Sequence, residues 1–174
     1  KGPSDAGKGK GKGKGAQTSA QRALEVCRLG CISLGALADG HKEVQTIVLD
    51  EGFAEVVLEA LEWYQLHPGL NQWALWALFN LAYDHQSNKV YMVKKGAVGA
   101  VVDAMKRHPG ERDLQRQGVA FFFSCLRFED GIDAARMRQV AHTAGLKGAL
   151  TAAIAAHPRD EVIKSMAKAM LDVA

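Results

Sequence analysis

Residues 70–82 of the sequence, LNQWALWALFNLA, decide the fold because this segment recurs along the chain at nearly constant spacing. Three further thirteen-residue segments align with it without gaps, at residues 26–38, 114–126 and 162–174, and the four starts lie 44, 44 and 48 residues apart. In each segment apolar residues fall at the three- and four-residue spacing of an amphipathic helix. A period of this size indicates a stack of helical repeats, in which each unit buries its apolar face against its neighbours.

Two further markers divide each repeat into three helices. A glycine recurs 18, 18 and 17 residues before three of these segments, at Gly52, Gly96 and Gly145. Glycine suits a sharp bend between helices because it adopts a positive φ without steric cost. A His-Pro pair then recurs between the second and third helices, at His67-Pro68, His108-Pro109 and His157-Pro158, and proline ends the helix before it.

The pattern therefore predicts three repeats of a short helix, a glycine bend and two longer helices, in residues 39–82, 83–126 and 127–174. For the second repeat the expected helices are residues 87–95, 97–107 and 113–127. A partial repeat in residues 17–38, holding one third-type helix, precedes them. Within the third helix of the second repeat, two of the rings of Phe121, Phe122 and Phe123 are expected in the core and one at the surface.

The composition is that of a packed protein, with 48% hydrophobic and 24% charged residues in 174. No run of eighteen apolar residues is present, so we expect no membrane span and a place in the cytoplasm or nucleus. Cys27, Cys31 and Cys125 are an odd number without a secretory signal, which favours reduced thiols in the core. Because Lys1 is not methionine and Ala174 falls in a helical pattern, we expect a piece of a longer polypeptide.

Residues 1–16 have a different composition from the rest of the chain. They hold five lysines and one aspartate, a charge of +4, so the remainder of the +3 chain carries −1. The alternating glycines and lysines leave nothing apolar to bury, which predicts a disordered tail or linker. The alternative is a weak, salt-sensitive contact of this tail with nucleic acid or an anionic surface.

The period, the glycine bend and the three-helix unit resemble the armadillo repeat family over residues 20–174. The closest local match is residues 76–82, WALFNLA, which is similar to repeats of the importin-alpha and beta-catenin type. The resemblance implies an all-α, right-handed α-solenoid of about three three-helix repeats plus a preceding partial repeat, with the third helices lining a concave groove. HEAT repeats are two-helix units and would leave the short helices before Gly52 and Gly96 unexplained.

Helical spacing places Gln72, Trp76 and Asn80 on one side of a third helix, pointing outward if the leucines face the core. The resemblance implies that a Trp and an Asn one turn later hold an extended peptide, the amide pairing with the peptide backbone. The alternative is partial burial, with the amide capping a carbonyl. Other groove candidates on the same face, four of which would make the groove floor basic, are Arg28, Arg116, Ser124, Lys164 and Lys168.

No catalytic, cofactor or metal site emerges from the sequence. His67, His108 and His157 recur at the same turn of each repeat, as structural residues do, and the carboxylates are scattered rather than paired. The sequence therefore predicts a non-catalytic scaffold that binds an extended segment of a partner protein, and leaves the oligomeric state open. The alternatives are polyanion binding led by the tail, or a structural segment of a larger solenoid.

Overall fold

The structure is a computed structural model that describes residues 18–126 and 132–171. These residues form ten α-helices and no strand, so the predicted all-α fold is confirmed. In chain order the helices are α1 (Ser19–Ala38), α2 (Lys42–Asp50), α3 (Phe53–Trp63), α4 (Pro68–Ala82), α5 (Gln86–Lys94), α6 (Ala97–Arg107), α7 (Arg112–Cys125), α8 (Ile132–Ala144), α9 (Leu146–Ala156) and α10 (Glu161–Leu171). The predicted tail of residues 1–16 lies outside the described residues.

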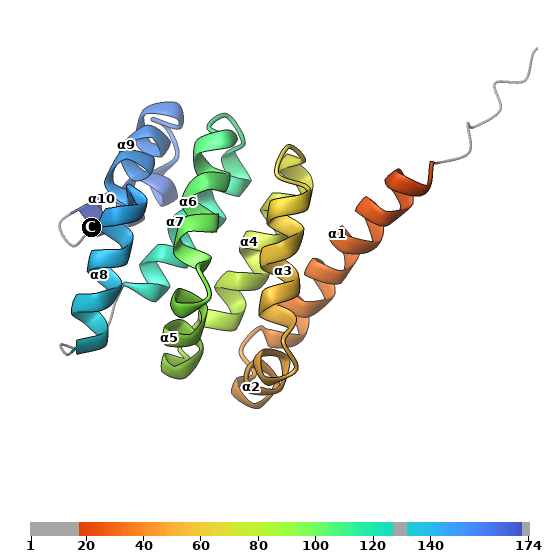
Figure 1. Cartoon of the computed structure of the whole chain (residues 1–174). Coiled ribbons are helices and arrows are strands. Elements are labelled where there is room, and N and C mark those ends of the chain that lie inside the picture. The colour runs from red at the N-terminus through yellow and green to blue at the C-terminus, as the bar shows by residue number, and fades with distance from the viewer. Residues whose placement is uncertain (1–17, 127–131, 172–174) are drawn as a thin grey trace, which may run out of the picture.

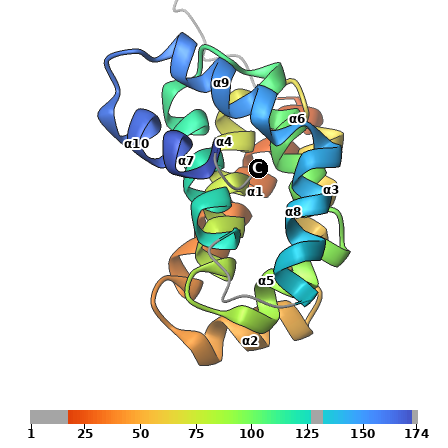
Figure 2. The ribbon, with the colours of Figure 1, turned by 90° about the vertical axis from the view of Figure 1, so that its left-hand side faces the viewer.

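The helices form a two-layered stack. Helices α1, α4, α7 and α10 pack side by side in chain order and make one layer. Helices α3, α6 and α9 make the second layer (Figures 1 and 2). The nine-residue helices α2 and α5 close one edge between the layers, whereas α8 has 13 residues and packs against α5, α6 and α9, so the first helix of the last repeat is not short as predicted. The core lies between the two layers because each long helix turns its apolar face toward the other layer.

Each of the three second helices begins immediately after a glycine in the left-handed conformation. The φ angles of Gly52, Gly96 and Gly145 are 77°, 88° and 79°, which confirms the positive φ expected at these bends. Side chains with a Cβ atom are strained in this region, so glycine is needed for the backbone conformation itself.

Replacing Gly96 with alanine is expected to lower the free energy of unfolding by about 1–2 kcal/mol. No atom lies within 4 Å of the Cβ position at Gly96, so backbone strain is the whole cost. The matched control is Gly99→Ala within α6, where the added Cβ also meets nothing within 4 Å. This control should stabilise the protein by up to about 1 kcal/mol, because alanine favours the helix. Urea denaturation of both variants measures the difference, and equal stabilities would contradict the strain.

The last repeat is one residue out of register with the ungapped alignment of the sequence. Helices α5, α6 and α7 begin 44 residues after α2, α3 and α4, whereas α9 and α10 begin 49 residues after α6 and α7. The interval of 48 residues predicted between the third helices of the last two repeats is therefore one residue too short. Ile163, which is 0% exposed, occupies the buried position of Leu114, while Val162 is 44% exposed. The residue that corresponds to Trp76 in α10 is therefore Ala169 rather than Lys168.

Two of the three recurring histidines join neighbouring repeats. His108 and His157 end α6 and α9, and their Nε2 atoms lie 2.8 and 2.9 Å from the backbone oxygens of Gln65 and Pro109 in the preceding repeat. His67 differs, because α4 begins directly after it at Pro68. The expectation that all three histidines occupy one structural position is thus wrong for His67, whose backbone carbonyl instead begins the helix.

Candidate interaction groove

The exposed face of the α4, α7 and α10 layer contains a hollow of about 450 Å³. We call it the aromatic hollow, because three aromatic rings and a methionine lie in its wall. Its lining residues are Phe79, Tyr83, Asp84, Lys89, Ala120, Phe123, Ser124 and Met166. The hollow lies over three consecutive third helices and so extends across the repeats. Phe123 is the ring of its block that reaches the surface, while Phe121 and Phe122 are buried, as the sequence predicted.

Aromatic side chains continue from the hollow along α4. The rings of Trp73 and Trp76 meet edge to face with their centroids 5.5 Å apart, and the rings of Phe79 and Tyr83 are also 5.5 Å apart. Tyr83 is 52% exposed at the end of the row. Rigid aromatic rings that remain partly exposed provide large contact areas for a partner at little entropic cost. Sequence reasoning missed Trp73, Phe79 and Tyr83, although together with Trp76 they recur at intervals of three, three and four residues.

Trp76 is half-buried and has a structural contact with α1. Its indole lies against Gly35, where an added Cβ atom would be 2.5 Å from Cε3 and 2.6 Å from Cζ3. Only a residue without a side chain lets α1 approach α4 this closely. The remaining surface of Trp76 lies on the same face as half-buried Gln72. These two predicted groove residues are therefore partly exposed.

Asn80 does not point outward, and its predicted position in the groove is wrong. The residue is 3% exposed, and its Nδ2 donates to the backbone oxygen of Gly35 at 3.0 Å. The reason is that α4 packs between α1 and α7 within its layer, so both flanks of the helix are buried as well as its inner face. A helical wheel with a single buried face cannot anticipate this. The structure instead supports the alternative prediction, in which the Asn80 side-chain amide donates a hydrogen bond to a backbone carbonyl.

Asn80 belongs to a set of buried amides that join four helices. Gln45 of α2 donates its Nε2 to the backbone oxygens of Asn80 and Tyr83, at 2.7 and 3.1 Å. Asn88 of α5 donates its Nδ2 to the oxygens of Gln45 and Leu81, at 3.1 and 2.9 Å. Three of these bonds satisfy the carbonyl groups of Asn80, Leu81 and Tyr83 near the end of α4, which the helix itself leaves unpaired. Gln45 and Asn88 have no distinguishing pattern in the sequence, so their role could not be foreseen.

The basic residues of the predicted groove are largely neutralised. Arg28 donates to both carboxylate oxygens of Glu25, at 2.6 and 2.9 Å, and Lys164 lies 2.7 Å from Glu161. Arg116 donates its Nε to Asp160 at 2.8 Å. Lys168 is exposed on α10, and Ser124 lies in the wall of the aromatic hollow. The predicted basic groove floor is thus corrected to a surface of paired charges beside aromatic rings.

Asp160 also fixes the start of α10. Its side chain is 4% exposed, and Oδ1 accepts from the backbone N–H groups of Val162 and Ile163 at 3.1 and 3.2 Å. Burial alone would raise the pKa of Asp160, but the bonds from Arg116 and the two N–H groups outweigh it and hold the pKa below its ordinary value. Arg116 therefore joins α7 to α10 and is less available to a partner than the sequence suggested.

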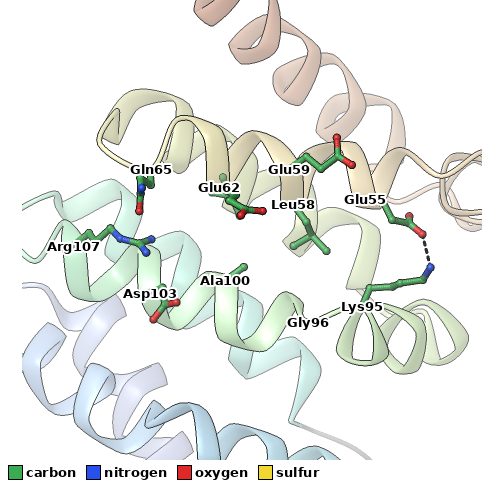
Figure 3. Close-up of a pocket in the computed structure, with 11 residues that line it drawn as sticks. Glu55, Leu58, Glu59, Glu62, Gln65, Lys95, Gly96, Ala100, Asp103 and Arg107 are labelled. Carbon is green, nitrogen blue, oxygen red and sulfur yellow. Dashed lines mark ion pairs between the residues drawn. The ribbon is translucent and has the colours of Figure 1, made fainter.

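A second hollow, of about 490 Å³, lies between α3 and α6 on the opposite layer (Figure 3). Carboxylates from both helices surround it, and Lys95 pairs with Glu55 at 2.9 Å. The hydroxyl of Tyr91 also donates to Glu55, and Lys95 stands 5.1 Å from the centroid of that tyrosine ring. These contacts join α3 to the end of α5, which gives this junction a role in repeat packing.

The three cysteines are free thiols that differ in exposure. Cys31 and Cys125 are buried, and burial raises the pKa of these thiols to about 11 and about 12. Cys27 is half-buried. Over residues 18–126 and 132–171, no cluster of three or more His, Cys, Asp or Glu side chains is arranged to hold a metal ion. In the same residues no helix combines the length and apolarity needed to cross a membrane.

The chain was compared with protein-family models, with curated proteins and with solved structures. None of the three comparisons found a match.

Proposed function

We propose that the chain is an armadillo-type solenoid segment that binds an extended segment of a partner protein along its third-helix face, without catalysis. The aromatic hollow carries this proposal. Phe79, Tyr83, Phe123 and Met166 bring apolar contact surface from three successive repeats to one place. Aromatic residues with a polar tip or a partly exposed edge are typical anchors of protein interfaces.

The spacing of the layer supports an extended occupant. Packed helices lie about 8–10 Å apart, and an extended chain advances about 3.3 Å per residue. About three residues of an extended peptide would therefore span each third helix. The peptide would present side chains to the aromatic hollow, between Phe79 of α4 and Met166 of α10, and a further side chain to Trp76 on α4.

The charge of this face does not support polyanion binding there. Arg28, Arg116 and Lys164 each lie beside a carboxylate, so a nucleic acid would meet paired charges. Nucleic-acid or anionic-surface binding led by residues 1–16 is the second candidate, and the composition of that tail alone supports it. It predicts binding that falls steeply with salt and disappears when residues 1–16 are deleted.

The test is selection of peptides from a displayed random library by the whole chain, followed by affinity measurements on two variants. Tyr83→Ala should weaken the selected peptides by about tenfold or more, as loss of an interface tyrosine often does. Leu66→Ala is the matched control, because Leu66 is a 76% exposed apolar side chain that lies after α3 and outside the aromatic hollow. Both side chains are exposed, so neither variant should lose helicity by circular dichroism.

Two outcomes would contradict the proposal. If the selected peptides bind Tyr83→Ala as well as the unchanged protein, the site is not the aromatic hollow. If binding requires residues 1–16 and falls with added salt while both variants bind normally, the tail is the binding element.

A further inference from the structure

Residues 83–85 join α4 to α5 and form one wall of the aromatic hollow. Tyr83 and Asp84 both line the hollow. Asp84 has a φ of 50° and is the only residue other than glycine with a positive φ in the part of the chain that the structure describes. Such a backbone conformation persists where neighbouring contacts hold it. The shape of the hollow therefore depends on what holds these three residues.

Helix α2 holds the first two residues of this segment. Gln45 donates its Nε2 to the backbone oxygen of Tyr83 at 3.1 Å, and the ammonium group of Lys42 lies 2.8 Å from the carboxylate of Asp84. Helices α2 and α5 stand side by side at one edge of the stack, so α2 reaches the segment directly (Figures 1 and 2). Neither contact changes in mildly acidic solution, because the hydrogen bond and the charge of Lys42 hold the pKa of Asp84 below its ordinary value.

The third residue, His85, makes two hydrogen bonds that fix the position of its proton. The hydroxyl of Thr46 donates to the backbone oxygen of Lys42 at 3.1 Å, so its oxygen can only accept from Nε2 of His85, which lies 2.9 Å away. On the other side of the ring, Nδ1 accepts from the backbone N–H of Asn88 at 3.4 Å and caps the start of α5. Only the neutral ring with its proton on Nε2 can make both bonds.

We infer that protonation of His85 releases the start of α5 and loosens the wall of the aromatic hollow, so that partner binding weakens in mildly acidic solution. The second proton of the ring goes to Nδ1, where it faces the N–H of Asn88, and two donors cannot bond to each other. The cap is thus present above the pH range in which an imidazole titrates and is lost as the pH falls through it. The inference rests on the proposed function, because it concerns regulation of the same hollow.

Charged groups of both signs surround His85. The carboxylates are those of Asp84, which precedes it, and of Glu43 in the first turn of α2. The ammonium groups are those of Lys42, which pairs with Asp84, and of Lys89 in α5. The two carboxylates favour an imidazolium and the two ammonium groups oppose it, so their effects offset each other. The hydrogen bonds of the ring are therefore what favours its neutral form.

Other histidines of the chain do not share this dependence. His108 and His157 contact backbone oxygens through Nε2, which carries a proton in the imidazolium as well, so those bonds survive protonation. His41 precedes α2 as His85 precedes α5, 44 residues later, but its side chain makes no capping bond. His41 is therefore a matched control at the equivalent position of the preceding repeat.

The state of the ring can be tested without a partner, by nitrogen-15 NMR of the whole chain. At about pH 7.5 the proton of His85 should lie on Nε2, and on titration to about pH 5 the backbone amides of Tyr83 and Asn88 should shift with the same midpoint as the ring. A proton on Nδ1 at neutral pH would overturn the inference. Amide signals that do not respond when the ring titrates would overturn it as well.

The effect on binding is measured with the peptides that the whole chain selects from the displayed library. Their affinity should fall by about threefold or more between about pH 7.5 and about pH 5.5, because loss of one cap weakens a helix start by about that factor. His85→Asn should keep the neutral-pH affinity at both pH values, since asparagine caps helices well and does not titrate. His41→Asn should leave the pH dependence unchanged.

The outcomes separate this inference from the proposed function. An affinity that is independent of pH, or a pH dependence that persists in His85→Asn, would overturn the inference while peptide binding itself stands. If the library yields no peptide, the proposed function fails instead, and the NMR titration still decides whether His85 controls residues 83–85.

Discussion

Replacing Phe121 with alanine is expected to lower the free energy of unfolding by about 3–5 kcal/mol, the largest loss of any change considered for this chain. Phe121 is fully buried between the two layers, and its ring packs edge to face against Phe122 with centroids 5.3 Å apart. Removing the ring leaves a cavity in the middle repeat, and the surrounding helices can close it only in part.

The matched control is Phe123→Ala, two residues along the same helix. Phe123 is half-buried in the aromatic hollow, so its removal should cost less, about 1–2 kcal/mol, because less contact area is lost. Denaturant titrations of the two variants provide the comparison. Equal losses would contradict the orientation of α7, and with it the assignment of Phe123 to the exposed face.

Replacing Gly35 with alanine is expected to lower the free energy of unfolding by about 2–3 kcal/mol. The added Cβ would lie 2.5 Å from the indole of Trp76 and 3.2 Å from the Cα of Ala77. The indole has little room to move because Trp73 meets it edge to face. The displacement would also weaken the hydrogen bond from Asn80 to the Gly35 carbonyl, so α1 should separate from α4 first.

Gly30→Ala provides the control on the same helix. Nothing lies within 4 Å of a Cβ atom at Gly30, so this change should stabilise the chain by up to about 1 kcal/mol through helix propensity. Chemical denaturation followed by tryptophan fluorescence measures both variants, because Trp76 lies against Gly35 at the α1–α4 contact and Trp73 packs on Trp76. If both alanines stabilise the protein, the close approach at Gly35 is refuted.

Most of the helix positions follow from local signals in the sequence. The range predicted for the second helix of the second repeat, residues 97–107, is that of α6, because Gly96 marks its start and the apolar spacing its extent. The last repeat was misaligned by one residue because its segment was started at Val162, 17 residues after Gly145, whereas the 18-residue interval of the other two repeats leads to Ile163.

The groove was predicted less well than the helices. Gln72, Trp76 and Ser124 lie on or beside the third-helix face, but Asn80 is buried and Arg28, Arg116 and Lys164 are paired with carboxylates. Helical spacing gives the direction of a side chain around its own helix. It does not predict which helices pack on the two flanks of that helix. Those neighbouring helices decide which of the candidate groove side chains remain accessible.

Repeat period, glycine bends and apolar spacing were sufficient to predict ten helices in their order, because each is a property of residues close together in the chain. Tertiary packing alone decided that Asn80 satisfies a carbonyl of α1, that Trp76 lies over Gly35, and that Phe79, Tyr83 and Phe123 meet in one hollow. These arrangements join residues more than thirty positions apart, and they depend on how closely two helices approach. That distance is set by the volumes of side chains on both helices, which no single segment specifies.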